Sequence, residues 1–193
     1  MPDPDWWKAL WPHPAEVITK LGVQPTWYVI DLCCGDGLFT LPLAKIARQV
    51  MAIDIDPVML RKAQARLAQA GLMNCNFVEA DAGSIQEIAQ PQSADLVLIA
   101  NTFHGVPDKV SLVRTVAAVL RPRGRFVVIN WHHRPREETT VLGQPRGPKT
   151  EMWMEPADVV GAVQPVGLTL AGVIELPPYH YAAMFERPTE AAA

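Results

Sequence analysis

Short apolar runs rich in β-branched residues alternate with longer stretches of helical periodicity along most of the chain. The runs that indicate strands cover residues 27–32, 50–54, 75–79, 95–100 and 125–130. The stretches that indicate helices cover residues 37–48, 57–70 and 109–120. Such alternation is typical of parallel strands joined by crossover helices. The pattern therefore predicts an α/β fold with a doubly wound, mostly parallel sheet in a three-layer αβα sandwich.

The C-terminal third departs from this alternation. Residues 134–150 mix charge, glycine and proline without clear periodicity, which predicts a flexible loop or mobile flap. Helical signals return at residues 155–158, and two β-like runs follow at 168–175 and 180–186. These two runs predict an antiparallel hairpin at one sheet edge. The tail, 188–193, is small and polar enough to be disordered.

Length and charge narrow the class of protein. The 193 residues fit a single domain over 1–193, with 1–25 as an N-terminal lid or helix. Lys and Arg number 17 and Asp and Glu 20, for a net charge of −3, and no run of like charge extends far. A nucleic-acid partner is not expected, because phosphate neutralisation needs clustered Lys and Arg. No signal-peptide pattern and no apolar stretch near 18 residues is found, so we expect a cytoplasmic protein without a membrane partner.

The strongest chemical signal lies at the end of the first predicted strand. Asp31 closes that strand, and Gly35 and Gly37 follow in a tight turn that lets a ligand approach the backbone. A dinucleotide fingerprint would place a third glycine at position 40, where this chain has Thr40. Asp31 and Asp36 would also repel a pyrophosphate. A ligand that carries an ammonium and a sulfonium suits these carboxylates better.

Two further carboxylates follow the second and third predicted strands. Asp54 lies where a carboxylate accepts hydrogen bonds from both hydroxyls of a ribose, which indicates a nucleoside. Asp81 lies at the same edge of the sheet and can accept a hydrogen bond from the exocyclic amine of adenine. Ile55 and Ala82 would supply apolar faces for the ring.

With these residues in place, the chain resembles the class I S-adenosylmethionine-dependent methyltransferases, particularly the small bacterial single-domain type with a Rossmann-like sheet. The resemblance spans residues 27–130 and rests on the stretches 29–37, 52–60, 79–82 and 119–126. It implies S-adenosylmethionine as cofactor and S-adenosylhomocysteine as product, with the methionine moiety, ribose and adenine held by the first three stretches in turn. Two positions where the family usually has glycine differ: the chain has Cys33 in the first turn and Arg123 in the last.

The resemblance also places the loop after the fourth strand, residues 101–108, beside the transferable methyl. Asn101 opens this loop and joins the predicted cofactor residues. The loop lacks the Asn-Pro-Pro-Tyr motif common in enzymes that methylate amide or base nitrogens, which favours a small-molecule acceptor. The predicted cofactor-binding residues are Asp31, Cys33, Gly35, Gly37, Asp54, Ile55, Asp81, Ala82 and Asn101.

The expected reaction is an in-line displacement in which the protein positions the reactants and excludes water. Candidates for a general base are His104, His132 and Tyr179, although a loop histidine that satisfies backbone groups explains His104 as well. Adjacent histidines seldom ligate one ion, so no metal is expected. Cys33 and Cys34 are expected to act as small buried apolar side chains rather than as nucleophiles.

Two alternative functions stay open at this stage, together with three interpretations of the N-terminal stretch. A non-catalytic S-adenosylmethionine-binding protein would keep the cofactor site with a closed acceptor cavity. An NAD-dependent oxidoreductase is disfavoured by Thr40 and the acidic turn. The N-terminal stretch 6–13, rich in tryptophan, fits a lid that lines an apolar acceptor site, a helix anchored by Trp packing, or a homodimer contact.

Overall fold

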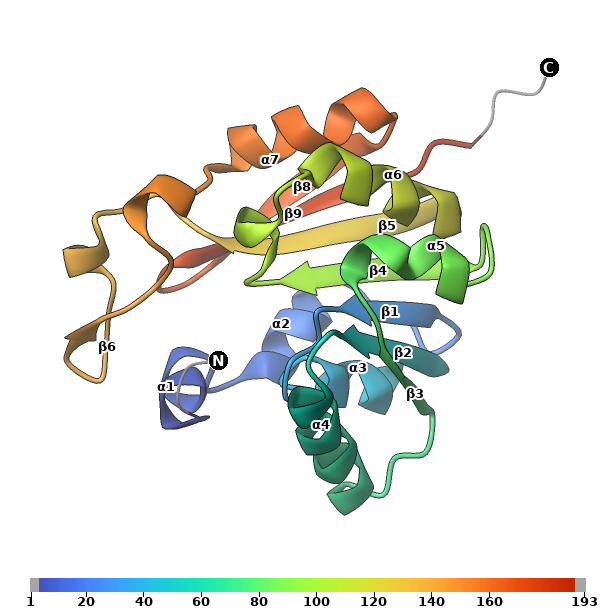
Figure 1. The fold of residues 1–193 in the computed structure, drawn as a ribbon, viewed down its shortest axis with the longest axis horizontal. Helices are drawn as coiled ribbons and strands as arrows, with labels where there is room; N and C mark the ends of the chain where they lie inside the picture. The colour runs from blue at the N-terminus through green and yellow to red at the C-terminus, as the bar shows by residue number, and fades with distance from the viewer. Residues whose placement is uncertain (1–3, 190–193) are drawn as a thin grey trace.

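The computed structural model describes residues 4–189, and a seven-stranded sheet forms its centre (Figure 1). The strands are β1 (Tyr28–Leu32), β2 (Gln49–Asp54), β3 (Cys75–Glu79), β4 (Ala94–Ala100), β5 (Leu120–Trp131), β8 (Thr169–Leu176) and β9 (His180–Glu186). Their order is β3-β2-β1-β4-β5-β9-β8. The first five strands are parallel, and β9 runs antiparallel to both β5 and β8. The predicted fold class, including the C-terminal hairpin at one edge, is confirmed.

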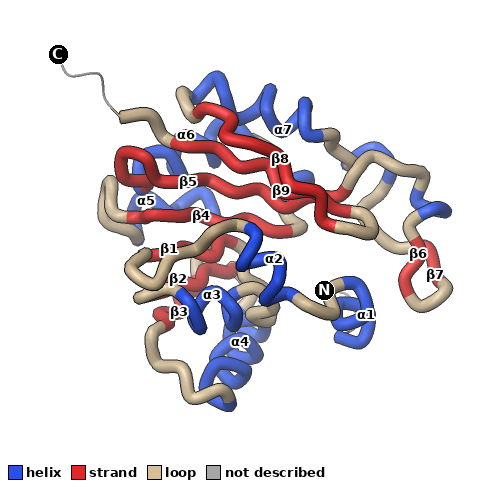
Figure 2. Tube along the Cα trace, turned by 180° about the vertical axis from the view of Figure 1, so that it is seen from behind, coloured by secondary structure: helices blue, strands red, loops and turns tan. Residues whose placement is uncertain are grey.

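Helices cover both faces of the sheet, as Figures 1 and 2 show. They are α1 (Pro4–Leu10), α2 (Pro14–Lys20), α3 (Thr40–Ile46), α4 (Pro57–Gln69), α5 (Ile85–Ile88), α6 (Lys109–Val119) and α7 (Pro156–Val163). Alternate residues of the buried strands serve the two sides: Leu96 and Leu98 face the core under α2 and α3, while Val97 and Ile99 face the core under α6 and α7. Within the described part of the chain, no helix is long and apolar enough to cross a membrane.

Side-chain caps fix where several helices begin. The Asp56 carboxylate accepts the Val58 N–H at 2.7 Å and starts α4 with Pro57 at its first position. Asp108 caps α6 in the same way by accepting the Ser111 N–H at 2.9 Å. Each cap places an aspartate directly at the carboxyl edge of the sheet. The residues that end strands and start helices are therefore the ones available to a ligand at that edge.

The turn before β5 differs from the prediction. The strand begins at Leu120 rather than at Arg125, because Leu120 already pairs with Ala94 of β4. The turn is also bonded to the residue after β9: the Arg123 N–H donates to the Arg187 carbonyl, and the Arg187 N–H donates to the Gly124 carbonyl, both at 2.8 Å. Arg123 has φ 64°, in the left-handed region. Glycine adopts this backbone conformation at the least cost, which accounts for the glycine that the family resemblance implied at this position.

Arg123→Gly is expected to raise the free energy of unfolding by about 1 kcal/mol, because glycine removes the steric cost of the left-handed backbone. The Arg123 side chain is exposed and makes only a 3.9 Å contact with Glu186, so little is lost with it. Urea denaturation of the variant measures the change. Arg123→Ala, which loses the same contact but keeps the strain, is the matched control. An equal gain in both variants would contradict this explanation.

The predicted loop, 134–150, contains more structure than expected, whereas the N-terminal region is helical, which was one of the two forms predicted for it. Residues 134–150 include a short hairpin of β6 (Thr140–Val141) and β7 (Gln144–Pro145), which the sequence pattern did not predict. The N-terminal region forms the two helices α1 and α2, and α1 contacts β6. Residues 1–3 of the predicted lid and 190–193 of the predicted tail lie outside the described residues.

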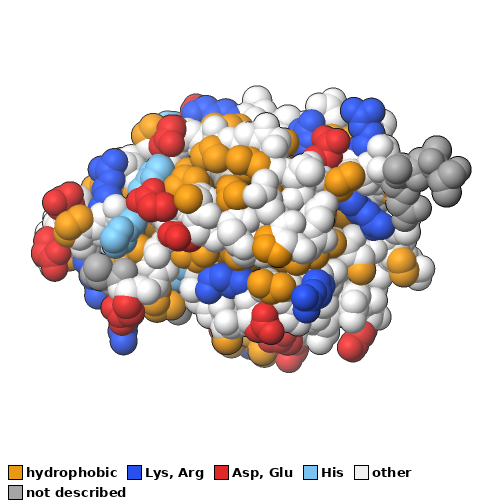
Figure 3. Space-filling view, turned by 90° about the horizontal axis from the view of Figure 1, so that it is seen from above, with side chains coloured by type: hydrophobic (Ala, Val, Ile, Leu, Met, Phe, Trp, Pro, Cys, Tyr) orange, Lys and Arg blue, Asp and Glu red, His pale blue; other side chains and the backbone are white. Residues whose placement is uncertain are grey.

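The face that carries α7 shows acidic and basic side chains scattered among each other (Figure 3). The edge strand β8 contributes two of the exposed apolar side chains, Leu170 and Val173, each 40% exposed. In the part of the surface visible in Figure 3, neither sign of charge forms a continuous stripe. The candidate functional side chains lie instead at the carboxyl edge of the parallel strands.

Candidate functional site

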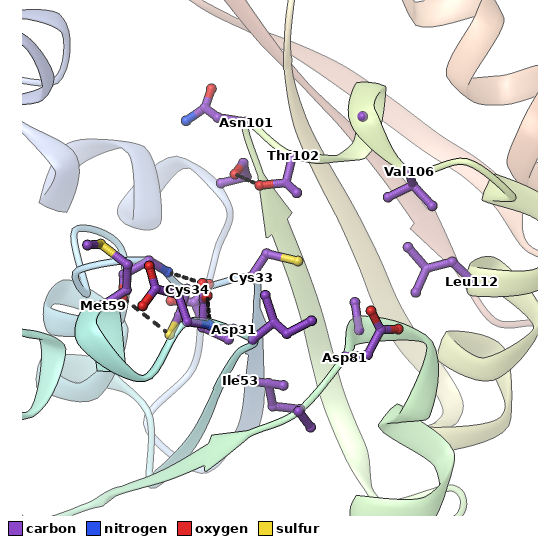
Figure 4. Close-up of a pocket in the computed structure, with 18 of the residues that line it drawn as sticks. Asp31, Cys33, Cys34, Ile53, Met59, Asp81, Asn101, Thr102, Val106 and Leu112 are labelled. Carbon is purple, nitrogen blue, oxygen red and sulfur yellow. Dashed lines mark hydrogen bonds between the residues drawn. The ribbon is translucent and has the colours of Figure 1, made fainter. Parts of the chain in front are cut away.

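A cavity of about 810 Å³ opens at the carboxyl ends of β1, β2 and β4, with the chain just after β3 closing one side (Figure 4). This is the point where the strand order reverses, since β1 lies between β2 and β4. Ligands of open α/β sheets bind in the crevice at such a switch point. The cavity is lined by eight of the nine predicted cofactor residues: Asp31, Cys33, Gly35, Asp54, Ile55, Asp81, Ala82 and Asn101.

Asp31 is the most deeply buried of the acidic side chains, only 2% exposed at the end of β1. The Thr40 hydroxyl donates a hydrogen bond of 2.6 Å to its Oδ2. Burial raises the pKa of Asp31 to about 7; the Thr40 hydrogen bond opposes this shift and the nearby Asp54 carboxylate adds to it. Thr40, which replaces the third glycine of a dinucleotide fingerprint, thus serves to orient this carboxyl group. A cation placed beside Asp31 would restore its charged form.

Asp54 presents both carboxylate oxygens at the end of β2. Its Oδ2 accepts the Gly35 N–H at 2.8 Å, and its Oδ1 accepts the Asp56 N–H at 2.9 Å. Each oxygen keeps a second lone pair, because a carboxylate offers about four acceptor positions. The side chain is half-buried and faces the cavity. The geometry therefore suits two hydroxyl donors arriving together, as a ribose diol would present them.

The third carboxylate lies just after β3. Asp81 accepts the Gly83 N–H on Oδ1 at 2.8 Å and is otherwise open to the cavity. Ile55, after β2, is 67% exposed, which is unusual for a branched apolar side chain. Ala82 lines the same part of the cavity. An apolar ring with a polar edge, such as adenine, would cover Ile55 and present its donors to Asp81.

The turn after β1 has a positive φ at three positions: Cys33 (60°), Gly35 (57°) and Gly37 (82°). Cys33 thus adopts the conformation that favours glycine in related chains. Gly37 does not line the cavity. A Cβ at this position would lie 2.9 Å from the Ala63 Cβ of α4, so Gly37 permits the close approach of α4 to the turn.

Asn101 lies in the loop after β4 and has φ 59°. Its backbone N–H donates to the Ile129 carbonyl at 2.9 Å, which fixes the loop to β5. The side-chain Oδ1 is buried at the cavity wall and has no hydrogen-bond partner among the described residues. An acceptor atom in this state costs free energy unless a ligand donates to it. Figure 4 shows Asn101 and Thr102 at one end of the cavity, with Ile53 and Asp81 toward the other.

None of the three predicted base candidates is among the residues that line the cavity. His104 contacts the Asn130 side chain at 2.9 Å, and burial lowers its pKa. His132 pairs with Glu175 at 2.8 Å, and the Tyr179 hydroxyl donates to the Thr140 carbonyl at 3.0 Å. Each of these groups therefore has a structural partner elsewhere.

The sequence interpretation left out several lining residues. They include Phe39, Met59, Val106, Pro107 and Leu112, which add apolar surface. Trp7 lines the cavity from α1, while its neighbour Trp6 is buried against Trp131 with ring centroids 6.3 Å apart. The structure thus shows the predicted Trp packing of the N-terminal helix, while its action as a lid stays a prediction. The clustering of tryptophans in the sequence pointed to this segment, but it did not indicate which indole would face the cavity.

Comparison with known proteins agrees with this architecture. A family model described as a methyltransferase domain matches residues 25–156. The ubiquinone biosynthesis O-methyltransferase of Methylobacterium nodulans is 32% identical over 152 residues, which cover 74% of this chain and 59% of that protein. The chain spans about half the length of the curated relatives it matches.

Solved structures share the fold at low sequence identity. The crystal structure of a SAM-dependent methyltransferase from Aquifex aeolicus superposes with a TM-score of 0.81 at 21% identity, covering 96% of this chain and 94% of that one. The cyclase SpnF superposes with a TM-score of 0.74 at 15% identity, covering 90% of this chain and 80% of that one. The fold alone thus does not fix the reaction. With a matching family model over most of its length, the chain belongs to the methyltransferase domain family, as its resemblance to the class I S-adenosylmethionine-dependent enzymes implied.

Proposed function

We propose that this chain transfers the methyl group of S-adenosylmethionine to a small-molecule acceptor. One observation carries the proposal: Asp31, Asp54 and Asp81 lie at or just after the carboxyl ends of three neighbouring strands and line one cavity. Neighbouring strands lie about 4.8 Å apart, so the three carboxylates form a row that matches an elongated nucleoside ligand. The name of the Methylobacterium nodulans relative, which refers to ubiquinone biosynthesis, supports an acceptor of small size.

The residues present fit this cofactor from one end to the other. Asp81, Ile55 and Ala82 would hold the adenine, and Asp54 the two ribose hydroxyls. Asp31, with Cys33 and Gly35 beside it, would hold the methionine moiety near the positive charges of the ammonium and sulfonium. The unpartnered Asn101 Oδ1 would accept a hydrogen bond at the methyl end. Gly37 would support the turn through its packing on α4 rather than by contact.

The chain itself would position the two reactants and exclude water from the site. When bound, S-adenosylmethionine supplies a methyl group on a sulfonium, which is electrophilic without further activation. Burial raises the pKa of the Cys33 thiol to about 12, so it stays protonated and does not compete as a nucleophile. Trp7 and Phe39 line the cavity and would help to exclude water once the ligands are bound.

The test is transfer of an isotopically labelled methyl group. The purified chain is incubated with methyl-labelled S-adenosylmethionine and a metabolite extract filtered below about 1 kDa, and labelled products are detected by mass spectrometry. We expect label in a small molecule and release of S-adenosylhomocysteine. Binding of S-adenosylmethionine without any transferred label would favour the non-catalytic alternative.

Cofactor affinity is expected to rise roughly tenfold between pH 5.5 and 7. Burial raises the pKa of Asp31 to about 7, so its carboxyl is protonated at the lower pH, whereas a bound cation favours the charged form. Binding near neutral pH should therefore release a proton. The cofactor ammonium stays charged between about pH 5.5 and 7, because an α-amino group has a pKa of about 7.7–8.0. Calorimetry in buffers of different ionisation enthalpy measures the proton, and Asp31→Asn should abolish both effects. A pH-independent affinity in the unchanged chain would contradict this role for Asp31.

A further inference from the structure

The charges that line the cavity all have one sign. Six lining residues are aspartates, and no Lys, Arg or His occurs among the described residues that line it. The aspartates come from the turns after four strands, and they are Asp31, Asp36, Asp54, Asp56, Asp81 and Asp108. This composition bears on the acceptor as well as on the cofactor.

Little in the surrounding protein neutralises these carboxylates. Asp36 pairs with Arg66 at 2.6 Å, the one ion pair recorded for the six within the described chain. The others accept hydrogen bonds from uncharged donors, such as the Ser111 N–H for Asp108 and the Thr40 hydroxyl for Asp31. Such donors stabilise a carboxylate without removing its charge. S-Adenosylmethionine adds a single net positive charge, so the loaded cavity keeps a negative potential.

Two aromatic side chains, Trp7 and Phe39, also line the cavity. The row runs from β3 to β1, which leaves the β4 side for the acceptor, where Asn101 and Thr102 lie. Trp7 reaches the cavity from α1, whose Trp6 stacks on Trp131 at the end of β5. Phe39 lines the cavity and packs edge-on against Trp11, with centroids 5.2 Å apart. These rings are held in place and offer flat apolar surface.

We propose that the methyl acceptor is an aromatic molecule that carries no negatively charged substituent, held between Trp7 and the loop at Asn101 and Thr102. This inference rests on the proposed function. A carboxylate or phosphate on the acceptor would meet the aspartates without a cation to receive it, and like charges placed together oppose binding. In the transfer, a lone pair of the acceptor forms the bond to the methyl carbon, the carbon–sulfur pair returns to sulfur, and a proton of the nucleophile leaves to solvent.

Three probes on one ring test the proposal: catechol, dopamine and 3,4-dihydroxybenzoate. The chain is first saturated with S-adenosylhomocysteine, and that binding is measured in its own right, so a failure at this step counts against the proposed function alone. Each probe is then titrated at low ionic strength. We expect catechol or dopamine to bind at least tenfold more tightly than the carboxylate. Equal or tighter binding of the carboxylate, or no binding of either uncharged or cationic probe to the loaded chain, would overturn the inference.

Two variants locate the effect. Trp7→Ala should weaken catechol binding severalfold while the affinity for S-adenosylhomocysteine is retained, and Trp27→Ala, which removes an indole that does not line the cavity, is the matched control. Thr102→Arg places a cation at the acceptor end and should shift the preference toward 3,4-dihydroxybenzoate. Suppose that Thr102→Arg leaves the preference between catechol and 3,4-dihydroxybenzoate unchanged, and that Trp7→Ala leaves the catechol affinity unchanged. The acceptor would then bind elsewhere.

Discussion

Asp54→Ala is expected to weaken the binding of S-adenosylmethionine by tenfold or more. Hydrogen bonds to a charged group contribute about 1.5–3 kcal/mol, and each 1.4 kcal/mol is about a factor of ten in affinity. Both oxygens of Asp54 already accept one backbone N–H each, from Gly35 and Asp56, and each keeps acceptor capacity for one hydroxyl of a diol. Calorimetric titration of the variant with the cofactor gives the change directly.

Asp54→Asn is the matched control for this variant. It preserves the shape and one acceptor oxygen, so its loss of affinity should be smaller than that of Asp54→Ala. Because Asp54 also holds the Gly35 turn, the thermal unfolding of both variants is recorded to separate a loss of folding from a loss of contact. A folded Asp54→Ala variant that binds the cofactor as tightly as the unchanged chain would contradict the assignment of Asp54 to the ribose.

Trp131→Ala is expected to lower the free energy of unfolding by about 3–5 kcal/mol, the range for large aromatic truncations in a core. Trp131 is 2% exposed and contacts four rings from three separate segments, including Trp6 of α1 and Trp153 after the β6–β7 hairpin. His180 lies closest, with ring centroids 4.1 Å apart. The loss of this side chain would therefore release α1, and with it Trp7, from the cavity.

Urea denaturation measures this change, and the fluorescence of the remaining tryptophans reports on α1. Trp27→Ala serves as control: Trp27 is only partly buried at the margin of the same core, lies under the Arg125 guanidinium, and is not among the described rings that contact Trp131. It should cost less than about 2 kcal/mol. A loss as small in Trp131→Ala as in Trp27→Ala would show that Trp131 does not anchor the N-terminal helix.

The fold and the row of carboxylates at the sheet edge followed from local patterns. Apolar runs of strand length predicted where Asp31, Asp54 and Asp81 would lie, because a residue that ends a parallel strand reaches the same sheet edge as its neighbours. No long-range information was needed for this step. The carboxylate row could therefore be predicted from the sequence, while its hydrogen bonds to Gly35, Asp56 and Thr40 depend on how the turns close.

The acceptor end could not be predicted in the same way. Trp7 reaches the cavity only because Trp6 packs on Trp131, a contact between residues far apart in the chain. His104 was a reasonable base candidate by its position in the loop, yet its side chain is hydrogen-bonded to Asn130 on β5. Gly37 looked like a ligand-facing glycine, but the need for space comes from Ala63 on α4. Each of these outcomes depends on tertiary packing, which residue spacing does not encode.

The most direct test of the cavity assignment is calorimetric titration of the chain with S-adenosylmethionine, S-adenosylhomocysteine and NAD in separate runs. The carboxylate row at Asp31, Asp54 and Asp81 predicts micromolar binding of the first two and none of NAD, whose pyrophosphate would meet Asp31 and Asp36. Binding of NAD with no binding of S-adenosylmethionine or S-adenosylhomocysteine would contradict it.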